Sequence, residues 1–291
     1  MRRYPLAVWT FAFAGPAFAQ PVPPPANPQE IVVQGERDRD RQLRDFVGAL
    51  TPTPRHPYDG QIGRFEWSVC PVVFGLGKAQ NEAIAARIRQ VGAAIGAELD
   101  KQPCVGNSLV IVADDKDATF AWMKRKLPGY FVNSAGRRLV IRQDKSHAIG
   151  WHVTDLLNAD GTQATVTPNG VYIVKALYLS HLQAASRPHF LGSVLIVDRA
   201  ALRGLTTTEF GDYAAMRTFA QIDPSGLKGQ AAPTILTVLD ASMDAAVPLT
   251  LTEWDLAFLR GLYGARVNQY AVTERGEIGR SMRKQLSSPG E

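Results

Sequence analysis

Asp212 and Tyr213 are neighbouring residues whose side chains could bind a ligand, and they lie in a helix predicted over residues 205–222. This helix follows SVLIVD, an apolar run that predicts a strand. In several secreted hydrolase folds, the catalytic residues lie on a helix placed in this way. Apolar residues make up most of the helix surface, however, which is typical of a helix packed in a core. Asp212 and Tyr213 therefore either face a ligand pocket or pack in the core, and packing is the simpler interpretation.

The five histidines do not have the spacing of a metal site. No two of them stand at i and i+4, and the zinc-binding sequence H-E-x-x-H is absent. His181 and His189 flank a predicted loop and could meet in space, although surface imidazoles near a turn explain them more simply. The serine-hydrolase sequence G-x-S-x-G is also absent. The sequence thus predicts no catalytic residue, no metal ligand and no cofactor.

Three other fragments resemble functional motifs but lack essential parts. Ser281 and Lys284 match S-x-x-K, but they lie in a polar segment without a strand beside it. Gly77 and Lys78 follow a predicted strand as in a phosphate loop, but the hydroxyl residue after the lysine is missing. The acidic residues of 114–117 are explained by capping of a following helix. Basic residues are interleaved with acidic ones, so nothing supports binding of nucleic acid.

The N-terminus has the three-part pattern of a secretory signal peptide. Arg2 and Arg3 precede an apolar stretch over residues 5–13, and AFA follows it, so we expect cleavage between Ala19 and Gln20. Removal of residues 1–19 takes away two arginines and no acid, which lowers the formal net charge from +5 to +3. No later stretch has the roughly 20 apolar residues of a membrane helix. We therefore expect a soluble exported protein, most simply periplasmic, without a transmembrane segment in the mature chain.

Cys70 and Cys104 are the two cysteines of the chain, and two cysteines in an exported protein usually pair. Each precedes an apolar run, CPVVFGLG and CVGNSLVIV, and a helical pattern separates the two runs. Neighbouring strands with aligned N-terminal ends would bring the sulfurs together. We predict a structural disulfide that stabilises the fold by roughly 3 to 4 kcal/mol.

The remaining pattern predicts an α/β fold, with a mixed twisted sheet, packed helices and α+β character in the middle. Ile84, Ile88, Val91, Ile95 and Leu99 form one apolar stripe of a helix. Two helices begin at capping boxes, Thr206 with Glu209 and Thr252 with Asp255, and Asn169-Gly170 predicts a hairpin turn. The predicted organisation is given by the following ranges: a partly disordered, proline-rich and charged linker over 20–64, one α/β domain over 65–270 and a polar tail over 271–291.

The runs SVLIVDRAALRGLTTTEFGDYAAMRTFAQI, APTILTVLD and LTLTEWDLAFLRGLY resemble an uncharacterised family of exported bacterial proteins, which is distantly similar to zincin-type metallopeptidases. The resemblance implies a zincin-like order of elements, with an active-site helix behind a strand. Peptidase-like members have an H-E-x-x-x pattern where this helix reads GDYAAM, residues 211–216. Asp212 and Tyr213 stand approximately where a ligand and a general base are expected, and the zinc ligands are missing.

The resemblance implies a non-catalytic, metallopeptidase-like protein, a pseudoenzyme with a binding or cell-envelope role and possible envelope partners. One alternative is a hydrolase with an unrecognised site formed by Asp212, His181 or His189. Another is an accessory of an outer-membrane uptake system, because EIVVQGE resembles the opening of the plug of TonB-dependent receptors.

Overall fold

The computed structural model describes residues 28–51, 60–143, 146–175, 183–227, 232–242 and 245–287. It divides the chain into two compact units, residues 1–38 and 39–291. Of the first unit it describes residues 28–38, which begin helix α1 (Pro28–Leu50). The predicted signal peptide and its cleavage site at Ala19 lie outside the described residues. EIVVQGE lies within α1, and the uptake role inferred from it stays a prediction.

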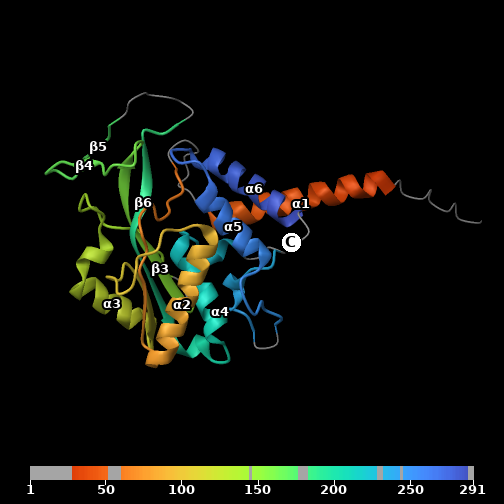
Figure 1. The fold of residues 1–291 in the computed structure, drawn as a ribbon. Coiled ribbons are helices and arrows are strands. Elements are labelled where there is room, and N and C mark those ends of the chain that lie inside the picture. Colours follow the sequence, from red (N-terminus) through yellow and green to blue (C-terminus); the bar gives the residue numbers. More distant parts are fainter. Residues whose placement is uncertain are drawn as a thin grey trace, which may run out of the picture. The chain divides into compact units, whose positions relative to one another are not determined.

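A four-stranded mixed sheet forms the centre of the second unit (Figure 1), as the α/β prediction requires. The strands stand in the order β1 (Pro71–Phe74), β2 (Ser108–Ala113), β6 (Ser186–Asp198) and β3 (Ala148–Asn158). The pairs β1–β2 and β2–β6 are parallel, whereas β3 is antiparallel to β6. The α/β fold class is therefore confirmed.

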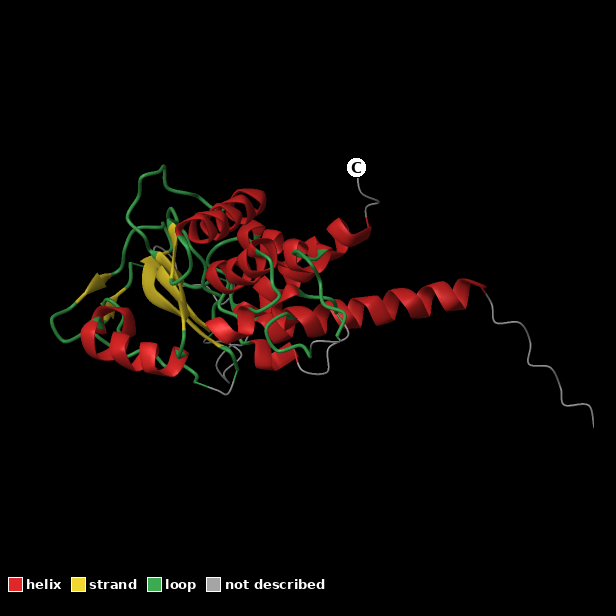
Figure 2. Ribbon diagram, turned by 90° about the horizontal axis from the view of Figure 1, so that it is seen from below, coloured by secondary structure: helices red, strands yellow, loops and turns green. Residues whose placement is uncertain are grey.

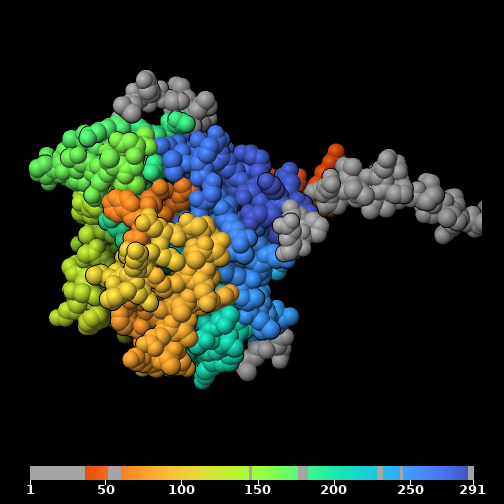
Figure 3. All heavy atoms as spheres, viewed as in Figure 1, coloured from red at the N-terminus to blue at the C-terminus, as the bar shows by residue number. Residues whose placement is uncertain are grey.

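Helices cover both faces of this sheet (Figure 2). Their bounds are α2 (Lys78–Ile95), α3 (Lys116–Lys126), α4 (Thr207–Phe219), α5 (Glu253–Gly264) and α6 (Ala271–Ser287), with short 3-10 helices η1 (Pro128–Phe131), η2 (Arg199–Leu202), η3 (Pro224–Leu227) and η4 (Ile235–Thr237). The larger core joins the sheet to α2, α4 and α5, and a smaller core lies under α3. Helix α2 also forms part of the molecular surface (Figure 3).

The helix patterns of the sequence are largely confirmed. The stripe from Ile84 to Ile95 is buried, but α2 ends at Ile95, because Gly96 adopts a left-handed backbone with φ 79°. Leu99 therefore lies beyond the helix and packs against the core from the following segment. Both predicted capping boxes form: Thr206 with Glu209 starts α4, and Thr252 with Asp255 starts α5.

The compact unit, residues 39–291, extends beyond the predicted domain over 65–270 at both ends. In α1, Leu43, Phe46, Val47 and Leu50 are buried, although this range was assigned to a linker. Their spacing forms an apolar stripe that the surrounding alternating charges obscure in the sequence. The predicted polar tail is helix α6, which packs against α5 and buries Ile278.

The predicted disulfide between Cys70 and Cys104 is present, with the two Cα atoms 6.1 Å apart. It joins the segments that lead into the parallel strands β1 and β2. The Asn169-Gly170 turn also forms, and it joins β4 (Thr165–Val166) to β5 (Tyr172–Ile173). The long strand before this hairpin, β3, pairs with β6 instead. Among the described residues, no helix has the length and apolar character needed to cross a bilayer.

Candidate functional site

Asp212 holds elements of the fold together and is not among the residues that line the two cavities described below. Its carboxylate is fully buried and accepts two hydrogen bonds from Arg87 on α2, at 2.6 and 3.0 Å. It also accepts from the Thr250 hydroxyl at 2.7 Å and from the Leu251 amide at 2.9 Å. These four bonds satisfy both oxygens and fix α4 against α2 and against the segment before α5. The candidate ligand role of Asp212 is therefore not supported by its contacts.

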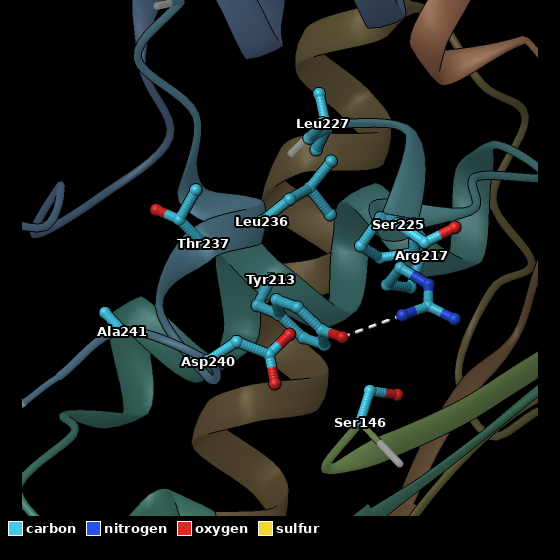
Figure 4. A pocket seen from close by; sticks show the side chains of 10 residues that line it. Ser146, Tyr213, Arg217, Ser225, Leu227, Leu236, Thr237, Asp240 and Ala241 are labelled. Carbon is cyan, nitrogen blue, oxygen red and sulfur yellow. Dashed lines mark hydrogen bonds between the residues drawn. The ribbon is translucent and has the colours of Figure 1, made fainter. Parts of the chain in front are cut away.

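Tyr213, the other candidate, lines a cavity of about 530 Å³ together with Arg217 (Figure 4). The two residues are four positions apart on α4, so they share one face of the helix. Nη1 of Arg217 donates a hydrogen bond of 2.7 Å to the Tyr213 hydroxyl oxygen. The guanidinium carbon lies 5.7 Å from the centre of the phenol ring. Both side chains are buried: Tyr213 is 3% exposed and Arg217 is 8% exposed.

Segments far apart in the sequence form the other walls of this cavity. Leu227 of η3 and Leu236 of η4 provide apolar walls, while Asp240 and Ala241 follow η4, and the remaining lining residues are Ser146, Pro224, Ser225 and Thr237. Asp255 of α5 positions η4, because its carboxylate accepts from the Thr234 hydroxyl at 2.6 Å and from the Ile235 amide at 2.9 Å. A mostly apolar concavity with a few convergent polar groups is the usual form of a small-molecule site.

A second cavity, of about 400 Å³, shares Arg217, Ser146 and Pro224 with the first. The start of the edge strand β3 and the Arg142–Asp223 ion pair also line it. Arg217 reaches β3 at Gly150, where an added Cβ would lie 2.7 Å from Nη2 of the guanidinium. Glycine at this strand position thus leaves room for the guanidinium, which a larger residue would displace.

Arg217 has no counter-charge among the described residues. Its contacts there are the hydrogen bond and the ring contact to Tyr213. A guanidinium does not lose its proton in proteins, and a buried charge without a partner costs free energy. The site thus presents a permanent cation, largely removed from water, to two adjoining cavities. A guanidinium binds carboxylate and phosphate groups through paired hydrogen bonds, so the arrangement suits an anionic group.

His152 lines the second cavity but is held in a neutral form. Its Nε2 lies 2.9 Å from the Thr218 carbonyl oxygen, which can only accept, so this nitrogen bears the ring proton. Nδ1 is buried without a hydrogen-bond partner in the described structure, and the ring stacks on Phe190 at 4.0 Å. Burial lowers the pKa of His152 to about 4, against a smaller opposing effect of the Thr218 hydrogen bond, and nearby Arg217 lowers it further. The imidazole therefore stays uncharged at neutral pH.

His189 is not the surface imidazole that the sequence predicted. It lies within β6, is fully buried, and packs 4.3 Å from the Trp67 ring. Burial lowers its pKa, and neither ring nitrogen has a hydrogen-bond partner within the described residues. No contact in this part of the chain joins it to Asp212, and His181 lies outside the described residues. The structure thus does not assemble the catalytic group expected from Asp212 and His189.

Two of the motif fragments noted in the sequence, the acidic residues of 114–117 and Ser281, make contacts that stabilise helices. Asp115 caps α3 by accepting from the amides of Asp117 and Ala118, as expected. Ser281 accepts a hydrogen bond from Gln285 within α6. In the described parts of the chain, no group of three or more histidine, cysteine, aspartate or glutamate side chains is placed to hold a metal ion.

No protein-family model, curated protein or solved structure matches this chain. The chemistry of the site therefore has to be derived from its geometry. Tyr213 could be predicted from the sequence, but Arg217, the residue that distinguishes the cavity, was missed. Its position four residues after Tyr213, on a helix whose surface is mostly apolar, was the available signal.

Proposed function

We propose that this chain is an exported, non-catalytic binding protein that holds the anionic group of a small ligand at Arg217. The observation that supports this most strongly is the buried guanidinium, which faces two cavities and has no acidic partner in the described structure. A buried, unpaired cation lowers the stability of a folded protein. Its presence is understandable if an anionic ligand supplies the missing partner.

The sequence resemblance on α4 adds a metallopeptidase-like ancestry with a changed site to this proposal. H-E-x-x-H proteins use positions i and i+4 of one helix face to hold zinc. In the register of the resemblance these positions are Asp212 and Met216, whereas the cavity is lined by Tyr213 and Arg217, one position further along the helix. A guanidinium repels a metal ion, but it offers positive charge of its own. In this proposal the protein binds an anion without hydrolysing it.

Export and a periplasmic role belong to the same proposal. The Cys70–Cys104 disulfide supports an oxidising compartment, because such bonds persist mainly outside the cytosol. The predicted signal peptide points in the same direction. A binding protein in the cell envelope would use this combination.

Isothermal titration calorimetry of the mature chain tests the proposal, with acetate, benzoate, octanoate, succinate and phosphate as probes. The variant is R217M, and the matched control is R280M, which changes an exposed arginine on α6. We expect at least one probe to bind, to weaken by about tenfold or more in R217M, and to be unchanged in R280M. Absence of binding for every probe, or equal binding by R217M, would overturn the proposal, as would stoichiometric, tightly bound zinc in the purified protein.

A further inference from the structure

A second charged side chain without an ion pair in the described structure faces the same cavity as Arg217. Asp240, in the turn after η4, contributes its carboxylate to the lining, and its side chain is in no ion pair within the described residues. In the view of Figure 4, this carboxylate and the Arg217 guanidinium lie on either side of the Tyr213 hydroxyl. Arg217 is buried, whereas Asp240 is exposed, so the cavity has a buried positive side and a solvent-facing negative side.

These charges restrict the ligand more than the cation alone would. A simple anion would gain attraction from Arg217 but would be repelled by the carboxylate of Asp240. A ligand that has a carboxylate and an ammonium group close together gains attraction from both residues.

The other walls are apolar. Leu227 and Leu236 line the cavity, and Figure 4 shows both leucines on one side of Tyr213, away from Ser146. A volume of about 530 Å³ leaves room for a side chain of the ligand beside its charged groups. Apolar walls favour an apolar side chain, because burying it releases ordered water at no cost in hydrogen bonds.

We infer that the ligand is a free amino acid with an apolar side chain, its carboxylate on Arg217, its ammonium group toward Asp240 and its side chain against Leu227 and Leu236. This inference rests on the proposed function and specifies the chemical class of the ligand.

Three related probes test it: phenylalanine, 3-phenylpropanoate, which lacks the ammonium group, and 2-phenylethylamine, which lacks the carboxylate. Calorimetry with the mature chain should give binding of phenylalanine at least about tenfold tighter than binding of either analogue. The D240N variant should remove the advantage of phenylalanine over 3-phenylpropanoate. The R217M variant should weaken both of these ligands, and R280M should weaken neither.

The outcomes separate this inference from the proposed function. If 3-phenylpropanoate binds as tightly as phenylalanine, and both depend on Arg217, the amino-acid inference is overturned and the anion site stands. If D240N leaves the preference for phenylalanine unchanged, Asp240 does not read the ammonium group and the inference is also overturned. If R217M binds phenylalanine as the unaltered chain does, both proposals fail. Loss of phenylalanine binding in an A241F variant that still binds glycine would further support placement of the side chain in this cavity.

Discussion

Asp212 and Arg217 lie on the same helix, are both buried, and differ in whether their charge has a partner. Asp212 accepts four hydrogen bonds, two of them from an arginine, so its charge is balanced within the protein. Arg217 donates to a phenol and lines two cavities. The first arrangement stabilises the fold, whereas in the function proposed here the second leaves a charge for a ligand to neutralise.

The D212A variant should lose stability rather than binding specificity. Removing this carboxylate leaves Arg87 and the Leu251 amide without their partner, and breaking a buried pair costs about 3 kcal/mol or more. The free energy of unfolding measured in urea reports this loss. D114A is the matched control, because the Asp114–Arg199 pair is exposed and should contribute less than about 1 kcal/mol. Equal stabilities of the two variants would show that Asp212 does not act as a structural partner.

Acid should destabilise the protein through His152. Its pKa is about 4 in the folded protein, below its ordinary value of 6.5, so the unfolded chain takes up a proton first as the pH falls. Stability is thus fully present above pH 6.5 and is lost progressively down to about pH 4, by roughly 3 kcal/mol at about 1.4 kcal/mol per pH unit.

The H152Q variant isolates this contribution, since glutamine does not titrate. We expect the free energy of unfolding of the unaltered chain, measured relative to that of H152Q, to fall by roughly 3 kcal/mol between neutral pH and pH 4. A difference that stays constant with pH would mean that His152 titrates alike in the folded and unfolded states.

At the scale of elements, α4 lies close against α2, and Gly211 permits that approach. A Cβ at this position would lie 2.8 and 2.9 Å from the Cγ and Cβ atoms of Arg87. The same close approach lets the Arg87 guanidinium reach the carboxylate of Asp212, the next residue along α4. Close packing of these two helices therefore places α4 so that its opposite face, with Tyr213 and Arg217, borders the cavity.

The G211A variant should be less stable than the unaltered protein, although alanine favours helices over glycine by about 1 kcal/mol. Overpacking against Arg87 should cost about 1 to 3 kcal/mol and outweigh that gain. The control is G279A on α6, where an added Cβ has no atom within 4 Å, so the helix preference of alanine should raise the stability. Melting temperatures measured by calorimetry decide the matter, and a rise in both variants would contradict the packing of α2 on α4.

Local signals made the elements predictable. The α2 stripe and the two capping boxes depend on residues at most a few positions apart, and they form as predicted. The pairing of β3 with β6 joins segments about 40 residues apart in the chain, with a hairpin between them, and no local pattern specifies it. His189 was placed beside a loop, before the predicted strand, because the polar residues around it hide the start of β6 at Ser186.

The site was less predictable than the elements, because it forms where distant segments meet. Arg217, Leu236 and Asp240 come from two short stretches of the chain, and Gly150 comes from a third. Tyr213 could be singled out by its place on the helix, but no pattern in the sequence indicates that the charge of Arg217 faces the same cavity. Only the fold reveals that Arg217 lacks an acidic partner among the described residues.

At the scale of the whole molecule, the compact unit over residues 39–291 needs both of its terminal helical segments. The second half of α1 buries Phe46 beside Trp254 and Phe258 of α5, with ring centres 5.5 and 6.2 Å apart. Helix α6 packs on α5 and buries Ile278 and Met282. Both ends of the unit thus complete the core around α5.

A fragment over residues 39–291 should therefore unfold cooperatively near the melting temperature of the mature chain, whereas a fragment over 65–270 should not. Loss of several fully buried apolar side chains costs about 2 to 5 kcal/mol each, which exceeds the stability of most domains when summed. Calorimetry and circular dichroism measure both fragments. Cooperative unfolding of 65–270 at an unchanged temperature would mean that α1 and α6 lie outside the cooperative unit.

The most direct test of the central claim is the free energy of unfolding of R217M, measured without ligand beside the unaltered chain. If Arg217 is a buried cation kept for a ligand, methionine of similar length should leave stability unchanged or raise it, because an uncompensated charge leaves the core. A loss of about 2 kcal/mol or more would contradict the account, because Arg217 would then be a structural residue of the fold.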